Sequence, residues 1–431
     1  MTVHSGSRRP LPHLAYLEAL ASTDEDSPRW HALTAGYAVL QLFDAWAGVD
    51  GGVLPPTGLE LRRVRKRLAT VAPGDPIARC LTQLVDVIEQ AAVEPAAVEP
   101  DADERRLRGL QVGRVLAAYG KLLQYESSWA LSKDVHDTII AYARLVDDEE
   151  RLLDSMLQVA FSLRMLGHFE ESREAYDTLH AAAGQVGSEH YLLLAELGFA
   201  KIAHERGNLP AAAGMLDRIL EDTRVGEHST VRSRALVDRA RVADQLGDYA
   251  SALVIGYEAL EKSTEPMTRD RLLVNLGMTL THLGLWSEAR DAYLIAHASA
   301  QEAAVRWVAQ VNLMELAYLD GNEVSFEQFR RAIPLHDLPP YIETVFHETS
   351  AHGLRTFGRK AEAVDSFRRM LEVAERHKLN EFVIKAAAAL EDVERAVAPI
   401  AASRRSDLDQ QPADVGAIAR SLTRMRELAG L

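Results

Sequence analysis

Hydrophobic side chains recur along most of the chain at the three-to-four-residue spacing of an α-helix, and runs of β-branched residues long enough for a strand are scarce. Between the helical segments a glycine returns at intervals of 40, 40, 37, 37 and 37 residues. These glycines are Gly167, Gly207, Gly247, Gly284, Gly321 and Gly358. A period of this length predicts an array of similar units. The fold class predicted from the pattern is all-α.

Each of these glycines is expected to end one helix in a left-handed conformation, because only glycine adopts it without steric cost. Small residues recur five positions after the turn, at Ser132, Ser172, Ala212, Ala252, Ala289 and Ala363, and seven positions before it, at Ala160, Ala200, Ala240, Gly277 and Ala351. This spacing predicts two helices that approach closely. The fifth turn departs from the pattern, with Phe326 in the small position. Residues 127–139 align with 167–179 and add a first repeat that lacks the glycine, so the array has seven predicted repeats.

The turn glycine, the small residues and the bulky residue that follows at Tyr176, Leu216, Tyr293 and Phe367 together resemble the tetratricopeptide repeat. The resemblance covers residues 105–397 and implies a right-handed superhelical solenoid of antiparallel helix pairs. These repeats, of 37–40 residues, are longer than the usual ~34 and lack the closing proline. A HEAT-like array, with repeats of ~40–47 residues, is the alternative, and the glycine-aromatic spacing argues against it.

The segments outside the array also read as helices. Residues 1–92 are predicted to form an N-terminal helical cap or degenerate repeats, with helical patterns over 30–46, 59–71 and 77–92. An acidic, proline-bearing linker is expected at 93–104, and residues 398–431 are predicted as a mobile segment followed by an amphipathic helix. That helix carries Val415, Ile418, Leu422 and Met425 at helical spacing and is expected to cap the last repeat. Contact with a second copy of the chain is the alternative.

The resemblance also implies a ligand groove lined by the first helix of each pair. Carried across residue by residue, its positions are Arg164, Lys201, His204, Arg234, Asp238, Arg241, Asp244, Arg271, Asn275, Met278, His282, Asn312, Glu315, Tyr318, Glu348, Thr349, His352 and Arg355. Asn275 and Asn312 fall in the same register of successive repeats, where peptide-binding relatives use asparagines. An amide both donates and accepts, so it could hold a peptide backbone or bond a neighbouring helix. Lys201, Arg234, Arg241 and Arg271 form either a basic stripe for an anionic ligand or a set of ion pairs.

Composition narrows the function further. The net charge of −15 disfavours nucleic acid and anionic membranes as partners, and the basic run 62–67 is interpreted as a solvated helix face. Cys80 is the only cysteine, which excludes an intrachain disulfide and favours a cytoplasmic location. No window of the chain has the length and apolarity of a membrane span. His347 and His352 are five apart, so they do not share a helix face as a zinc pair would.

No phosphate loop, nucleophile motif or cofactor signature is present, so we predict a non-enzymatic protein without a cofactor. The favoured function is a protein- or peptide-binding scaffold, or a regulatory subunit that acts through another chain. A self-associating structural subunit that uses the terminal helices is one alternative. A sensor or enzyme for a small anion, with the basic groove as its site, is the other.

Overall fold

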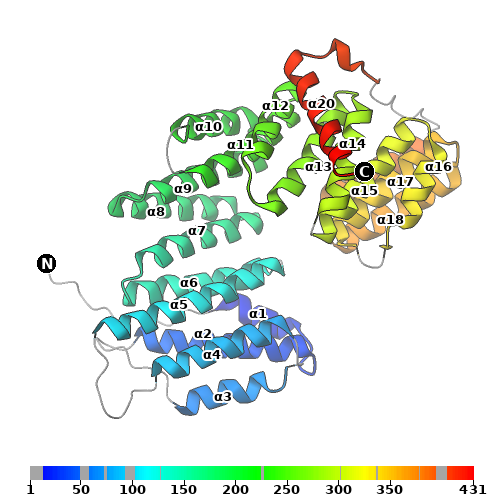
Figure 1. Cartoon of the computed structure of the whole chain (residues 1–431). Helices are drawn as coiled ribbons and strands as arrows, with labels where there is room; N and C mark the ends of the chain where they lie inside the picture. The colour runs from blue at the N-terminus through cyan, green and yellow to red at the C-terminus, as the bar shows by residue number, and fades with distance from the viewer. Residues whose placement is uncertain are drawn as a thin grey trace. The chain divides into compact units, whose positions relative to one another are not determined.

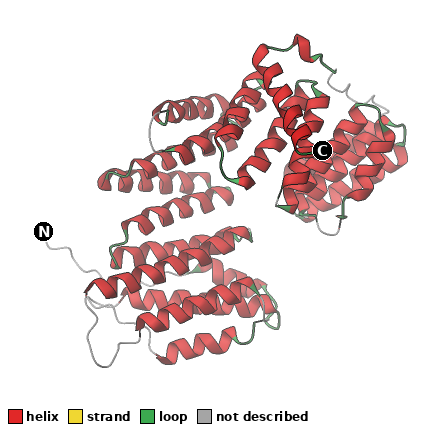
Figure 2. Ribbon diagram, viewed as in Figure 1, coloured by secondary structure: helices red, strands yellow, loops and turns green. Residues whose placement is uncertain are grey.

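We describe the protein from a computed structural model over residues 13–48, 58–71, 75–92, 102–126, 128–224, 228–300, 302–335, 338–377, 379–394 and 405–431. Within these ranges the regular elements are all helices, as Figure 2 shows. The chain divides into two compact units, Met1–Gly207 and Asn208–Leu431. The all-α prediction is therefore confirmed. Several segments with sequence predictions lie outside the described residues. They are 49–57 and 72–74, which fall between the predicted N-terminal helical patterns, most of the predicted linker (93–101) and part of the predicted mobile segment (398–404).

The described part of the first unit contains nine helices, and each contacts the next along the chain (Figure 1). They are α1 (Leu14–Ser22), α2 (Pro28–Gly48), α3 (Gly58–Leu68), α4 (Pro76–Ala92), α5 (Ala102–Tyr125), α6 (Trp129–Leu145), α7 (Glu149–Met165), α8 (Phe169–Val186) and α9 (Glu189–Glu205). The first four helices share one apolar core with α5 and α6, around Phe43, Leu84 and Leu116. Helices are thus present over the three N-terminal segments where the apolar pattern predicts them.

The described part of the second unit continues the same arrangement. Its helices are α10 (Leu209–Asp222), α11 (Ser229–Gln245), α12 (Tyr249–Lys262), α13 (Pro266–His282), α14 (Trp286–Ser299), α15 (Ala303–Leu319), α16 (Glu323–Ala332), α17 (Pro340–Thr356), α18 (Lys360–Arg376), α19 (Asn380–Glu394) and α20 (Ala413–Leu428), with a 3₁₀ turn at Leu408–Gln410. Within each pair the two helices pack together, and the first helices α11, α13, α15 and α17 also contact one another in succession. These four helices, called the first-helix row below, form one continuous face.

The six turn glycines all adopt the left-handed conformation, with φ between +71° and +79°. At Gly247 the chain closes the end of α11 with a hydrogen bond from the Asp248 N–H to the Ala243 carbonyl, 3.0 Å long. This bond satisfies a carbonyl that the end of the helix would otherwise leave unpaired. The predicted role of the glycines as helix caps is confirmed.

The small residues allow the close helix contacts that the pattern predicts. A Cβ atom added to Gly277 in α13 would lie 2.4 Å from the Tyr293 ring of α14. Phe326, the exception in the pattern, is buried in α16, and a Cβ at Gly353 of α17 would lie 2.2 Å from its ring. A bulky residue is therefore accommodated at the fifth turn because a glycine in the next helix takes over the role of the small one.

The C-terminal helix α20 is not where the sequence places it. We predicted a cap on the last repeat, but α20 packs against α12 and α14, the second helices of two earlier repeats. Val415, Ile418 and Leu422 are buried in that contact, and the Tyr257 hydroxyl lies 2.7 Å from the Ser421 hydroxyl. The prediction fails because an amphipathic pattern shows that a helix has a partner without showing which apolar surface it covers.

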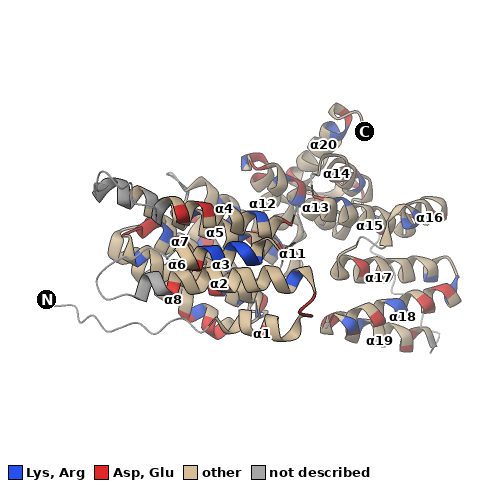
Figure 3. Ribbon diagram, turned by 90° about the horizontal axis from the view of Figure 1, so that it is seen from below, with Lys and Arg blue, Asp and Glu red and all other residues tan. Residues whose placement is uncertain are grey.

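The basic run on α3 behaves as a partly paired helix face (Figure 3). Leu61 and Val64 point into the core, while Arg65 forms ion pairs with Asp86 and Glu89 of α4 at 2.6 and 2.5 Å. This agrees with the interpretation of the run as a solvated face. Among the described helices, none is long and apolar enough to cross a membrane.

Candidate functional site

A cavity of about 260 Å³ opens on the first-helix row of the second unit. Its walls come mainly from α11 and α13, with its floor on α12 and one side chain from α17. The lining residues are Val237, Ala240, Arg241, Asp244, Gln245, Ala252, Gly256, Leu272, Asn275, Leu276, Met278, Thr279 and Tyr341. Of the predicted site residues, Arg241 and Asn275 lie here, together with Asp244 and Met278 from the wider set of groove positions. Thr279 and Tyr341 were missed, since neither falls in the register that the resemblance supplies.

Asp244 organises the polar side of this cavity. Its carboxylate accepts a 2.9 Å hydrogen bond from the Thr279 hydroxyl, and the Nδ1 atom of His282 lies 3.3 Å from the same oxygen. The His282 ring also contacts Tyr249, with ring centroids 4.8 Å apart. The hydrogen bond to Asp244 raises the pKa of His282 above its ordinary value, although burial opposes the shift. Two side chains of α13 thus contact the Asp244 carboxylate of α11 at the cavity.

Two further carboxylates follow Asp244 along the first-helix row. Burial raises the pKa of Glu315 on α15, and the charge of Glu348 on α17 adds to the shift. Burial likewise raises the pKa of Glu348. Glu315 hydrogen-bonds with Tyr318 on its own helix. Neither glutamate forms an ion pair with a lysine or arginine of the described residues. The charges of His282 and Lys385 oppose the pKa shifts of Glu315 and Glu348 respectively, but burial outweighs them. These half-buried carboxylates therefore have no directly bonded cation among the described residues.

The two asparagines of the shared register have different surroundings. Asn275 is half-buried, lines the cavity, and its side-chain amide has no hydrogen-bond partner among the described residues. Asn312 is only 8% exposed and does not line the cavity. Burial raises the pKa of the Tyr293 hydroxyl of α14, and the nearby Asn312 side chain opposes the shift. Its Nδ2 atom is buried without a partner within the described part of the chain. Of the two, only Asn275 has an amide that a ligand can reach in this structure.

The predicted basic residues do not form one continuous stripe. Arg271 makes a bidentate ion pair with Glu302, at 2.8 and 2.9 Å. Arg234 and Arg241 are exposed and have no ion pair with the described residues. Lys201 belongs to the first unit and is half-buried. Of these two arginines only Arg241 lines the cavity. The three carboxylates of Asp244, Glu315 and Glu348 are called the acidic row below.

The remaining predicted residues have clear environments. His352 packs edge-on against Phe367, with ring centroids 5.3 Å apart, and burial lowers its pKa. Arg355 is half-buried on the same helix, and His204 is half-buried in the first unit. Among the described residues, no cluster of three or more histidine, cysteine, aspartate or glutamate side chains could hold a metal ion.

We expect the Glu315→Gln variant to be more stable than the wild type at neutral pH. The folded-state pKa of Glu315 is raised, so its ionisation destabilises the fold at pH values above the ordinary value of 4.5. The glutamine has no such charge to bury. The gain in melting temperature should shrink as the pH falls and vanish well below 4.5, where the glutamate is protonated in both states. Thermal denaturation of the variant and the wild type from neutral to acidic pH measures the difference in melting temperature. Glu261→Gln, at an exposed position of α12, is the control. A gain that is the same at every pH would contradict a buried charge at Glu315.

The comparisons with known proteins agree with this architecture. No family model matches the sequence, and no curated protein resembles it significantly. The apo form of the quorum sensor NprR from B. thuringiensis superimposes with a TM-score of 0.50 at 13% identity, over 78% of this chain and 99% of that one. NprR in complex with its cognate peptide NprX gives 0.45 at 14% identity, over 78% and 99% of the two chains. A Rap protein complexed with competence and sporulation factor gives 0.44 at 13% identity, over 89% and 99%.

At this level of identity the likeness establishes the fold. The helix pairs, the left-handed turn glycines and the structural match to NprR together define a helical-repeat protein of the tetratricopeptide type. Both the predicted fold class and the predicted resemblance are confirmed.

Proposed function

We propose that the second unit binds a peptide, or an extended segment of a partner protein, along its first-helix row. The observation that carries the proposal is the free amide of Asn275 at the cavity of α11 and α13. An asparagine amide can donate to a backbone carbonyl and accept from a backbone N–H at the same time. Within a groove, two such bonds fix the register of an extended chain whatever its side chains are. The likeness in fold to the quorum sensor NprR supports a binding function over a catalytic one.

The charges favour a peptide with a basic side chain. Asp244, Glu315 and Glu348 lie on three of the four helices in the row, and the two half-buried glutamates form no ion pair with a lysine or arginine of the described residues. A lysine or arginine from a ligand would add a directly bonded countercharge to those of His282 and Lys385 in a partly desolvated place, where such a pair is strongest. The exposed Arg241 at the rim is positioned to take a carboxylate at the end of the same peptide. This charge preference is the reverse of the anionic ligand that a basic stripe would select.

Selection from a peptide library tests the proposal. A randomised display library is passed over the immobilised full chain, and bound peptides are sequenced. We expect enrichment of Lys and Arg at one fixed position. The Asp244→Asn, Glu315→Gln, Glu348→Gln variant should lose that enrichment, and Glu261→Gln should keep it. Enrichment that is identical for the triple variant would contradict the acidic row as the recognition element. Capture of no peptide by the wild type would contradict the peptide-binding function itself.

The predicted cytoplasmic location is kept as part of this proposal, because Cys80 is the only cysteine and has a free thiol.

A further inference from the structure

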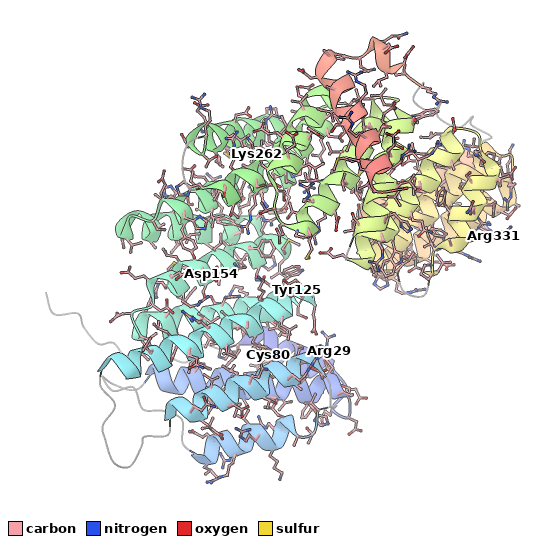
Figure 4. The ribbon with its side chains drawn as sticks, in the orientation of Figure 1. Arg29, Cys80, Tyr125, Asp154, Lys262 and Arg331 are labelled. Atoms are coloured by element: carbon pink, nitrogen blue, oxygen red, sulfur yellow. The ribbon has the colours of Figure 1, made fainter. Side chains whose placement is uncertain are left out.

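The first unit has a separate cavity of about 400 Å³ where the ends of four helices meet. The N-terminal ends of α2, α4 and α6 and the C-terminal end of α5 surround it. Its lining residues are Ser27, Pro28, Arg29, Ala32, Leu33, Asp75, Ile77, Tyr119, Leu123, Glu126, Ser128 and Leu131. Figure 4 labels Arg29 at this end of α2. The cavity shares no residue with the first-helix row of the second unit.

Charges of both signs face this cavity without neutralising one another directly. Burial raises the pKa of Glu126, the charge of Asp75 adds to the shift, and the charge of Arg29 opposes it. The three groups are therefore close enough to interact. Arg29 nonetheless forms no ion pair or hydrogen bond with the described residues. The cavity thus holds one uncommitted guanidinium group and a pair of carboxylates that repel each other.

The three helix N-termini at the cavity are not equally capped. The Ser27 hydroxyl accepts the Trp30 N–H at 3.2 Å, and the Asp75 carboxylate accepts the Ala78 N–H at 2.9 Å. Ser128, at the start of α6, makes no such capping bond. Among the described residues, no side chain caps the first N–H groups of α6, and no hydrogen bond engages the Ser128 hydroxyl. These groups can bind an anionic group, which the positive end of the helix dipole favours.

The rest of the cavity wall is apolar, apart from the Tyr119 side chain, whose hydroxyl is paired with that of Tyr16. Leu33, Ile77 and Leu131 contribute aliphatic surface. The Tyr119 hydroxyl is fully buried and lies 2.8 Å from the Tyr16 hydroxyl, so it is already paired. A volume of this size lies near the lower end of the range for small-molecule sites, about 300–1,000 Å³.

We propose that this cavity binds a free α-amino acid with an apolar side chain. Arg29, with Ser128 and the start of α6, takes the carboxylate. Asp75 and Glu126 take the ammonium group, whose positive charge relieves their mutual repulsion. The aliphatic wall takes the side chain. A ligand of this class carries both charged groups on the same carbon atom, which matches a cavity that presents both countercharges beside one apolar surface.

Isothermal titration calorimetry with the full chain tests the assignment. We expect L-leucine to bind, and N-acetyl-L-leucine and L-leucinamide, which each lack one charge, to bind at least about tenfold more weakly. Arg29→Gln and Glu126→Gln should each weaken the binding of leucine by a similar factor. Arg79→Gln, which changes an exposed residue of α4 outside the lining, should leave the affinity for leucine unchanged. Both variants change exposed side chains, and circular dichroism confirms that they remain folded.

Two outcomes would overturn this assignment. One is the absence of binding by leucine, methionine and phenylalanine at concentrations up to about 10 mM, beyond the range of a useful site. The other is equal affinity for leucine, N-acetyl-L-leucine and L-leucinamide, which would show that the charged groups of the cavity do not bind the ammonium and carboxylate groups. Asn275→Ala should leave leucine binding unchanged, because Asn275 belongs to the second unit.

Discussion

Asn275→Ala should bind a selected peptide about 5- to 150-fold more weakly than the wild type, with an unchanged melting temperature. The alanine removes an amide that has no hydrogen-bond partner among the described residues, so the fold loses little. The bound peptide, in contrast, is left with an unpaired backbone donor and acceptor, which costs about 1–3 kcal/mol. Fluorescence anisotropy with a labelled peptide from the library selection measures the change.

Asn312→Ala is a matched control that the repeat itself provides. Asn312 has the same register one repeat later, but it is buried near Tyr293. We expect this variant to lower the melting temperature, because it removes atoms from a packed buried site, and to change peptide affinity little. If Asn312→Ala weakened binding as strongly as Asn275→Ala without loss of stability, the asparagines would act together on the ligand. The different roles that we assign to them would then be wrong.

Leu422→Ala in α20 should destabilise the second unit by about 2–5 kcal/mol, the usual cost of deleting a fully buried leucine side chain. Leu422 is 0% exposed and packs in the same core as Leu260, Ala292 and Ile295 of α12 and α14. Hydrogen exchange followed by mass spectrometry should show faster exchange in α12, α14 and α20, with α5 to α8 of the first unit unchanged. Arg424→Ala, an exposed position of the same helix, is the control.

Removal of residues 405–431 should have a still larger effect. It uncovers the apolar surface of α12 and α14 and leaves buried Asp291 without its ion pair to Arg426, 3.2 Å long. We expect the truncated chain to self-associate, because association buries the exposed apolar surface. Light scattering after gel filtration measures the mass. A monomeric truncated chain with unchanged exchange in α12 and α14 would show that α20 is dispensable for the second unit.

The sequence by itself determined the local architecture of this protein. The glycine period predicted six turns, and all six glycines have the positive φ that a residue with a Cβ atom adopts only at a cost. The apolar spacing predicted helices in the N-terminal segments and an amphipathic helix near the C-terminus, and the structure has them. These features depend on residues within one or two helical turns of each other, so they can be read directly from the order of residues.

The tertiary structure decided everything that depends on which helices meet. Asn275 and Asn312 are equivalent in the sequence, and they differ because Asn312 is buried among its neighbours whereas Asn275 lines the cavity. The docking of α20 on α12 and α14 depends on apolar surfaces far away in the chain. The acidic row forms because Asp244, Glu315 and Glu348 come from different repeats whose first helices pack in succession. Arg271 does not neutralise these carboxylates, since it forms an ion pair with Glu302. Burial and pairing are properties of neighbours in space, and a register along the chain carries no information about them.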